Sequence, residues 1–172
     1  MQLEYSEKMD AFYRGQHIEP FQSHIIDSGV AKGVIPFGSA VELVSISENY
    51  LAEQAQVLTD TGVFHGVAVL VDHTEQDAYA VVTRTSNALG GAQDTIAEAE
   101  AGFKDKAPVA IMKTGRVVVD LASDAAYGAE VFPAKEGGVF STVDGGFGGS
   151  IKCIVHRTAD ANGLGIIEMF RV

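Results

Sequence analysis

The sequence predicts a mainly β fold, an antiparallel barrel or sandwich with one or two short helices and an extended N-terminal arm. Apolar residues make up 47% of the 172 residues, and 19 glycines are spread along the chain, as in a globular protein with many tight turns. Short apolar or alternating runs recur between turn residues, which is typical of all-β domains. The length suits one domain, residues 23–172, preceded by an arm at 1–22.

Residues 1–22 are polar and show no sustained helical or strand period. A segment of this kind packs either on its own domain or on another chain, and the sequence leaves both open. Its aromatic residues are Tyr5, Phe12, Tyr13 and Phe21.

Residues 24–41 lead into the β domain through turn chemistry. Gly29, Gly33 and the unit Ile35-Pro36-Phe37-Gly38 predict turns, because proline fixes φ and glycine accepts positive φ. The alternation over residues 39–44 then predicts a strand. Turn residues of this kind specify geometry and assign no function.

The middle of the chain predicts two paired strands and a helix. Residues 63–71 are nearly all apolar and predict a buried strand, and residues 79–85 predict a second strand that pairs with it across a polar loop. A helical turn is expected around residues 50–56. Asp94 and Gly102 are suited to begin and end a short helix over 95–101.

The C-terminal half contains the clearest hairpin pattern in the sequence. Residues 108–112 and 116–121 are apolar runs separated by Lys113-Thr114-Gly115, which predicts two strands and a turn. Four further strands are predicted at residues 129–133, 139–142, 151–156 and 165–172.

Charge and hydropathy exclude two classes of partner. The formal net charge of −11 repels nucleic acid, which is bound through Lys and Arg. No apolar run is long enough to span a membrane, and the first residues do not resemble a signal peptide. We therefore expect synthesis in a cytosol, where the single Cys153 stays reduced.

No motif predicts catalysis, a cofactor or a metal. Cys153 alternates with apolar neighbours and is expected in the core, and His65 is expected as a core or interface histidine. The loop Asp72-His73-Thr74-Glu75, with Asp77, matches no metal-ligand spacing. The glycine-rich residues 145–152 lack a phosphate-binding ending and predict a flexible loop with one exposed side chain, Phe147.

The order of several sequence blocks resembles the structural cement, or capsid decoration, family of tailed bacteriophages. The blocks are Ile26-Asp27-Ser28-Gly29 with residues 35–41, Gly66-Val67-Ala68-Val69 followed by Asp72-His73-Thr74, residues 108–119, residues 126–132 and residues 163–169. The helical insert at 88–102 departs from the family pattern.

The resemblance implies a non-enzymatic virion protein, made in the host bacterial cytoplasm, that binds the outer face of the mature capsid. It implies the major capsid protein as partner and a homo-oligomer, with a trimer favoured over a dimer. The expected capsid contacts are Tyr5, Phe12, Tyr13, Phe21 and Phe147, because interfaces depend strongly on buried aromatic side chains. A small-molecule or carbohydrate-binding β domain is the alternative, followed by a metal-dependent enzyme.

Overall fold

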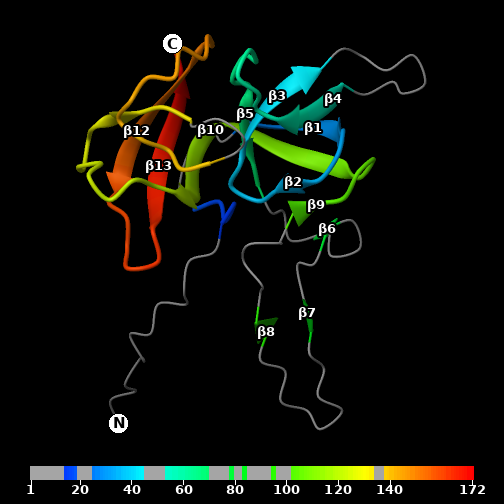
Figure 1. The fold of residues 1–172 in the computed structure, drawn as a ribbon, viewed down its shortest axis with the longest axis horizontal. Helices are drawn as coiled ribbons and strands as arrows, with labels where there is room; N and C mark the ends of the chain where they lie inside the picture. Colours follow the sequence, from blue (N-terminus) through cyan, green and yellow to red (C-terminus); the bar gives the residue numbers. More distant parts are fainter. Residues whose placement is uncertain are drawn as a thin grey trace, which may run out of the picture.

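The computed structural model describes residues 14–18, 25–44, 53–69, 102–133 and 138–172, together with the backbone of three short strands at 78–79, 83–84 and 94–95. These residues contain thirteen strands (Figure 1), so the predicted mainly β class is confirmed. The strands are β1 (Ile25–Ala31), β2 (Ile35–Pro36), β3 (Ala40–Val44), β4 (Gln54–Val57), β5 (Gly66–Ala68), β6 (Ala78–Tyr79), β7 (Thr83–Arg84), β8 (Asp94–Thr95), β9 (Gly102–Phe103), β10 (Pro108–Asp120), β11 (Glu130–Val131), β12 (Ile151–Arg157) and β13 (Leu164–Arg171).

Eight strands form one large sheet in the order β1-β4-β3-β5-β10-β13-β12-β11. Because β1 also pairs with β10, the first five of these strands are joined in a ring. The pairing of β1 with β4 is parallel, which differs from the predicted antiparallel arrangement. Two small sheets, β2-β9-β6 and β7-β8, complete the described strands.

The predicted hairpin at residues 108–121 is wrong, because β10 is one continuous strand of 13 residues. Its first half pairs with β1 and β5, whereas residues 115–120 pair with β13. Gly115 lies where the partners change and has a φ of 127°, a conformation that glycine adopts at little cost. In Figure 1, β10 accordingly runs from the β1–β5 side of the molecule to the β12–β13 side.

The predicted helix at 95–101 is not confirmed, and its first residue, Thr95, lies in a strand. Asp94 belongs to β8 and Gly102 begins β9, while residues 96–101 lie outside the described part of the chain. A Cβ atom at position 102 would lie 2.3 Å from the carbonyl oxygen of Ile35, so β2 requires a glycine there. The pairing of β9 with β2 thus explains why residue 102, which the sequence suggested as the end of a helix, is a glycine.

Two other local predictions also differ from the structure. The helical turn expected around 50–56 overlaps β4, whose pairing with β3 outweighs the local helical preference. Of the strand expected over 63–71, the described residues 63–69 form only β5, and Val63 is 60% exposed. β5 does not pair with β6, because β5 lies between β3 and β10 in the sheet, and β6 pairs with β9.

The turn predicted at Gly29 is wrong, because Gly29 lies inside β1 and is paired with Val109 of β10. Several other strands confirm the prediction. The unit at 35–38 forms β2 and a turn, with Gly38 at a φ of 76°. The strand predicted at 39–44 is β3, and those predicted at 129–133, 151–156 and 165–172 correspond to β11, β12 and β13. The residues predicted as a strand at 139–142 make isolated bridges, from Phe140 to Leu121 and from Ser141 to Phe132.

Two buried apolar clusters occupy the two sides of β10. Ile111 belongs to the first cluster, with Ile35, Val41 and Phe103. The adjacent Met112 belongs to the second, as expected for successive residues of a strand, whose side chains point to opposite faces. The second cluster also takes in buried residues of β3, β5, β12 and β13, so both parts of the large sheet share it.

Candidate functional site

The described part of the predicted N-terminal arm is bound to the body of the protein. This segment, residues 14–18, is called the arm base. The Gly15 amide donates to the Val118 carbonyl at 2.8 Å, and the Ile18 amide donates to the Arg116 carbonyl at 2.9 Å. The arm base therefore runs along β10 as an additional, short pairing partner.

Side-chain contacts fix the arm base further. Arg14 makes a bidentate ion pair with Asp120, with Nε 2.6 Å and Nη2 2.8 Å from the two carboxylate oxygens. Gly15 is buried at a φ of 73°, and a Cβ atom there would lie 2.8 Å from the Cβ atom of Phe37. Ile18 packs on a small apolar cluster formed by Val118, Leu164 and Ile166.

Four of the five predicted capsid contacts lie outside the described residues. These are Tyr5, Phe12, Tyr13 and Phe21. Phe12 and Tyr13 directly precede Arg14 in the sequence, and Arg14 is held on the body by its ion pair with Asp120.

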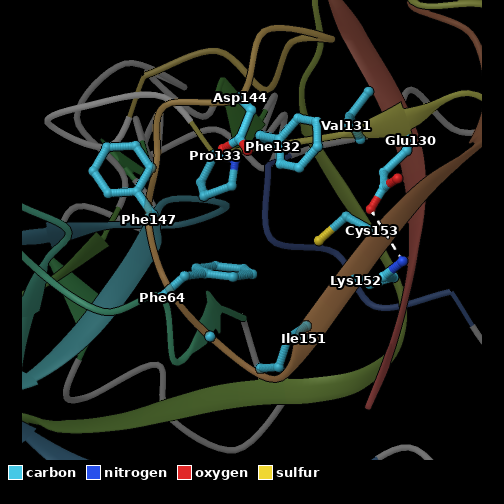
Figure 2. Close-up of a pocket in the computed structure, with 11 residues that line it drawn as sticks. Phe64, Glu130, Val131, Phe132, Pro133, Asp144, Phe147, Ile151, Lys152 and Cys153 are labelled. Atoms are coloured by element: carbon cyan, nitrogen blue, oxygen red, sulfur yellow. Dashed lines mark ion pairs between the residues drawn. The ribbon is translucent and has the colours of Figure 1, made fainter. Parts of the chain in front are cut away.

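The fifth predicted contact, Phe147, lines a pocket between β11, β12 and the loop of residues 144–149, here called the aromatic pocket (Figure 2). The pocket has a volume of about 160 Å³. Its apolar lining comes from three distant parts of the chain, and the residues are Phe64, Val131, Phe132, Pro133, Phe147, Ile151 and Cys153. Glu130, Asp144 and Lys152 add charged groups to the lining.

One hydrogen bond ties the loop that carries Phe147 to the body, and a second stabilises the loop itself. The Phe64 amide donates to the Gly148 carbonyl at 3.1 Å, and the Gly146 amide donates to the Asp144 carboxylate at 2.8 Å. Phe147 is half-buried and packs against the second apolar cluster, which corrects the expectation of an exposed side chain in this loop.

Cys153 lies in the core, as predicted, with its sulfur directed into the aromatic pocket in Figure 2. Burial raises the pKa of its thiol to about 12. Since the thiolate is the reactive form, this residue is poorly suited to act as a nucleophile near neutral pH.

A charged cluster that the sequence did not suggest lies where β1, β10 and the start of β5 meet. Asp27 forms an ion pair with Lys113, and its Oδ2 atom lies 3.9 Å from Nε2 of His65. The hydrogen bond from Lys113 lowers the pKa of Asp27, whereas burial lowers the pKa of His65. The sequence predicts a turn at Lys113, and no local pattern indicates its ion pair with Asp27.

The described residues contain no group of three His, Cys, Asp or Glu side chains arranged to hold a metal ion. The loop at 72–77, considered as a metal site from the sequence, lies outside them. Within the same described ranges, no helix has the length and hydropathy of a membrane span.

A comparison with protein families decides the assignment. The profile of the phage family described as "Structural cement protein (E217 gp24/Pam3 gp6)" matches residues 1–169. The chain belongs to this structural cement family. Membership confirms the resemblance noted from the sequence blocks and assigns the protein a structural, capsid-associated role.

A solved structure supports the fold of this cement-family chain. A chain in "The capsid of Myoviridae Phage XM1" is similar with a TM-score of 0.51 and 14% sequence identity. The similarity covers 98% of this chain and 96% of the other. A search of curated proteins finds no match.

Proposed function

We propose that this cement-family protein binds the outer surface of the mature phage capsid and stabilises contacts between adjacent major capsid subunits. The observation that carries the proposal is the family match over residues 1–169, which spans both the β body and the N-terminal segment. The acidic character of the chain, with a net charge of −11, supports a protein partner rather than nucleic acid.

The aromatic residues before the arm base are the proposed capsid anchors. Phe12 and Tyr13 adjoin Arg14, which is held by the ion pair with Asp120. Ordering one end of a segment before it binds reduces the conformational entropy lost on association. Tyr5 and Phe21 are proposed as further contacts, with a homo-oligomer, favoured as a trimer over a dimer, presenting several copies to the lattice.

The proposal is tested first by composition. Quantitative mass spectrometry of purified virions should find this chain at a copy number comparable with that of the major capsid protein. Electron cryomicroscopy of capsids, with and without added protein, should show the additional density on the outer face. Absence of the chain from virions, or density confined to the inner face, contradicts the proposal.

The stabilising role is tested on the same particles. Capsids that carry the protein should retain packaged DNA to a higher temperature than capsids without it, because the bound protein adds contacts between neighbouring subunits. Equal DNA-release temperatures at full occupancy would show that the protein decorates the capsid without stabilising it.

A further inference from the structure

We propose that the aromatic pocket receives one phenyl-sized apolar side chain, flanked by Lys or Arg, from a capsid subunit. The proposal rests on the proposed function and specifies a second attachment point, separate from the N-terminal segment. It also gives Phe147 a role, as one wall of the pocket (Figure 2).

The size of the pocket matches one aromatic or large aliphatic side chain. Its volume of about 160 Å³ is close to that of apolar cavities of about 150 Å³ that accept a benzene molecule. Figure 2 shows Phe64, Phe147 and Phe132 around the same space, with Ile151 at its lower edge. An apolar group that enters such a space loses its contact with water and gains aromatic contacts.

The walls of the pocket are held by the core and by the backbone. Phe64 is 4% exposed and packs edge to face on Phe140, with ring centroids 6.2 Å apart. Cys153 and Val131 are buried and face each other across paired strands β12 and β11. A pocket built on fixed elements can accept a side chain with little rearrangement, which favours binding.

The charges around the pocket favour basic residues next to the inserted side chain. Glu130 and Asp144 supply two carboxylates, against the single ammonium group of Lys152. Lys152 lies 3.7 Å from Glu130 and both side chains are about half exposed, so this ion pair is weak and leaves Asp144 uncompensated within the pocket lining. A basic residue beside the inserted side chain complements this excess.

The same argument favours a capsid subunit over a second copy of this chain. Acidic residues outnumber basic ones by 23 to 12 in this chain, so a second copy has few basic side chains to offer to the acidic rim of this pocket, even where copies associate through other surfaces. A partner segment with an apolar side chain next to Lys or Arg meets both the apolar lining and the acidic rim.

The first experiment tests the pocket on the isolated protein, using benzylammonium, benzyl alcohol and benzoate as probes. Methyl NMR signals of Val131 and Ile151 should shift most with benzylammonium, less with benzyl alcohol and least with benzoate. The double variant Glu130→Gln, Asp144→Asn should weaken benzylammonium binding about threefold and leave benzyl alcohol unchanged, because it removes only the charges. The amide oxygen of the new Asn side chain still accepts a hydrogen bond from Gly146.

The second experiment measures binding to capsids. Ile151→Phe fills the pocket with its own ring and should lower capsid affinity about tenfold, the loss expected when one large apolar side chain is no longer buried. Ile25→Phe makes the same change at the first residue of β1, outside the pocket lining, and should bind normally. Phe147→Ala, which removes a wall, should also bind weakly and guards against a folding defect in Ile151→Phe.

The outcomes separate this proposal from the proposed function. If the wild-type protein binds capsids and Ile151→Phe and Phe147→Ala bind equally well, the pocket proposal is overturned while the function stands. If the wild-type protein does not bind capsids, the function and the capsid occupant both fail, and the NMR titration alone decides whether the pocket accepts a cationic phenyl group. If Ile151→Phe changes only the oligomeric state, the occupant is a second copy and the proposal is wrong.

Discussion

The neighbours of Gly15 leave no room for a side chain larger than a hydrogen atom. At this position a Cβ atom would lie 2.9 Å from the Gly38 amide nitrogen and 3.0 Å from the Ala68 carbonyl oxygen, as well as close to Phe37. These are mostly backbone atoms of the body and cannot move aside without disturbing the surrounding turn and strand. The residue therefore acts as the point where the arm base seats against the core.

We expect Gly15→Ala to lower the free energy of unfolding by about 2 kcal/mol, from the left-handed φ together with the close contacts. Gly163→Ala is the matched control, because Gly163 has a φ of 80° but no atom within 4 Å of the added Cβ. Urea denaturation of both variants measures the difference. If Gly15→Ala lowers the free energy of unfolding no more than Gly163→Ala does, the close contacts around position 15 have no effect on stability.

The cluster of Asp27, Lys113 and His65 predicts how stability depends on pH. Burial lowers the pKa of His65 from its ordinary value of 6.5, with a further lowering by Lys113 that Asp27 opposes. The unfolded chain then binds a proton at a pH where the folded chain does not, so stability falls as pH drops below 6.5. The pKa of Asp27 is lowered from 3.8, so its contribution is lost only at still lower pH.

His65→Gln should therefore flatten the decrease in melting temperature between pH 7 and about pH 5. Calorimetry of the variant and the wild type across this range measures the effect, with other histidines contributing equally to both. Parallel curves for the two proteins would show that His65 titrates alike in the folded and unfolded states.

At the scale of elements, the arm base behaves as part of the β body. It pairs with β10 and covers Val118, Leu164 and Ile166 through Ile18, so its removal exposes an apolar surface. The segment before Arg14 contains Phe12 and Tyr13, which are proposed to bind the capsid, and the two parts of the predicted arm are therefore expected to differ in what their loss causes.

Deletion of residues 1–13 should leave the melting temperature nearly unchanged and reduce capsid binding. Deletion of residues 1–18 should in addition lower the melting temperature by several degrees, because it removes the ion pair with Asp120 and the packing of Ile18. Calorimetry and capsid co-sedimentation of both truncated proteins provide the measurements. Full capsid occupancy by the protein lacking residues 1–13 would rule out Phe12 and Tyr13 as anchors.

The sequence could predict those elements whose geometry is decided locally. Pro36 and Gly38 restrict φ at their own positions, so the turn at 35–38 follows from the residues themselves. Residues 113–115 are compatible with a turn or with a bent strand, and pairing with β13 decides between them. The aromatic pocket could not be predicted, since Phe64, Phe132 and Phe147 meet only in the folded chain.

At the scale of the whole molecule, the two apolar clusters depend on one strand. Ile111 and Met112 are adjacent in β10 and belong to different clusters, and the second cluster includes residues from both parts of the large sheet. Loss of either cluster therefore removes support from the other, and we expect the described body to unfold as one cooperative unit.

Ile35→Val and Ile167→Val test this coupling with the same change in each cluster. Both residues are fully buried, and each substitution should cost about 1 kcal/mol. Cys153, which lies in the second cluster, reports unfolding through its reaction with a thiol reagent during urea denaturation. Ile35→Val should shift the Cys153 labelling midpoint as far as Ile167→Val does; an unchanged midpoint would show two independently unfolding parts.

The continuity of β10 also has a mechanical consequence. A force applied along this strand loads its hydrogen bonds to β1, β13 and the arm base in shear, so that many bonds must break together rather than one after another. In a hairpin at the same place, the same force would pull the two strands apart, and their hydrogen bonds would break one after another. The replacement of a turn by a continuous bent strand thus makes the molecule resist a force applied along β10, between the β1–β5 part and the β12–β13 part of the sheet.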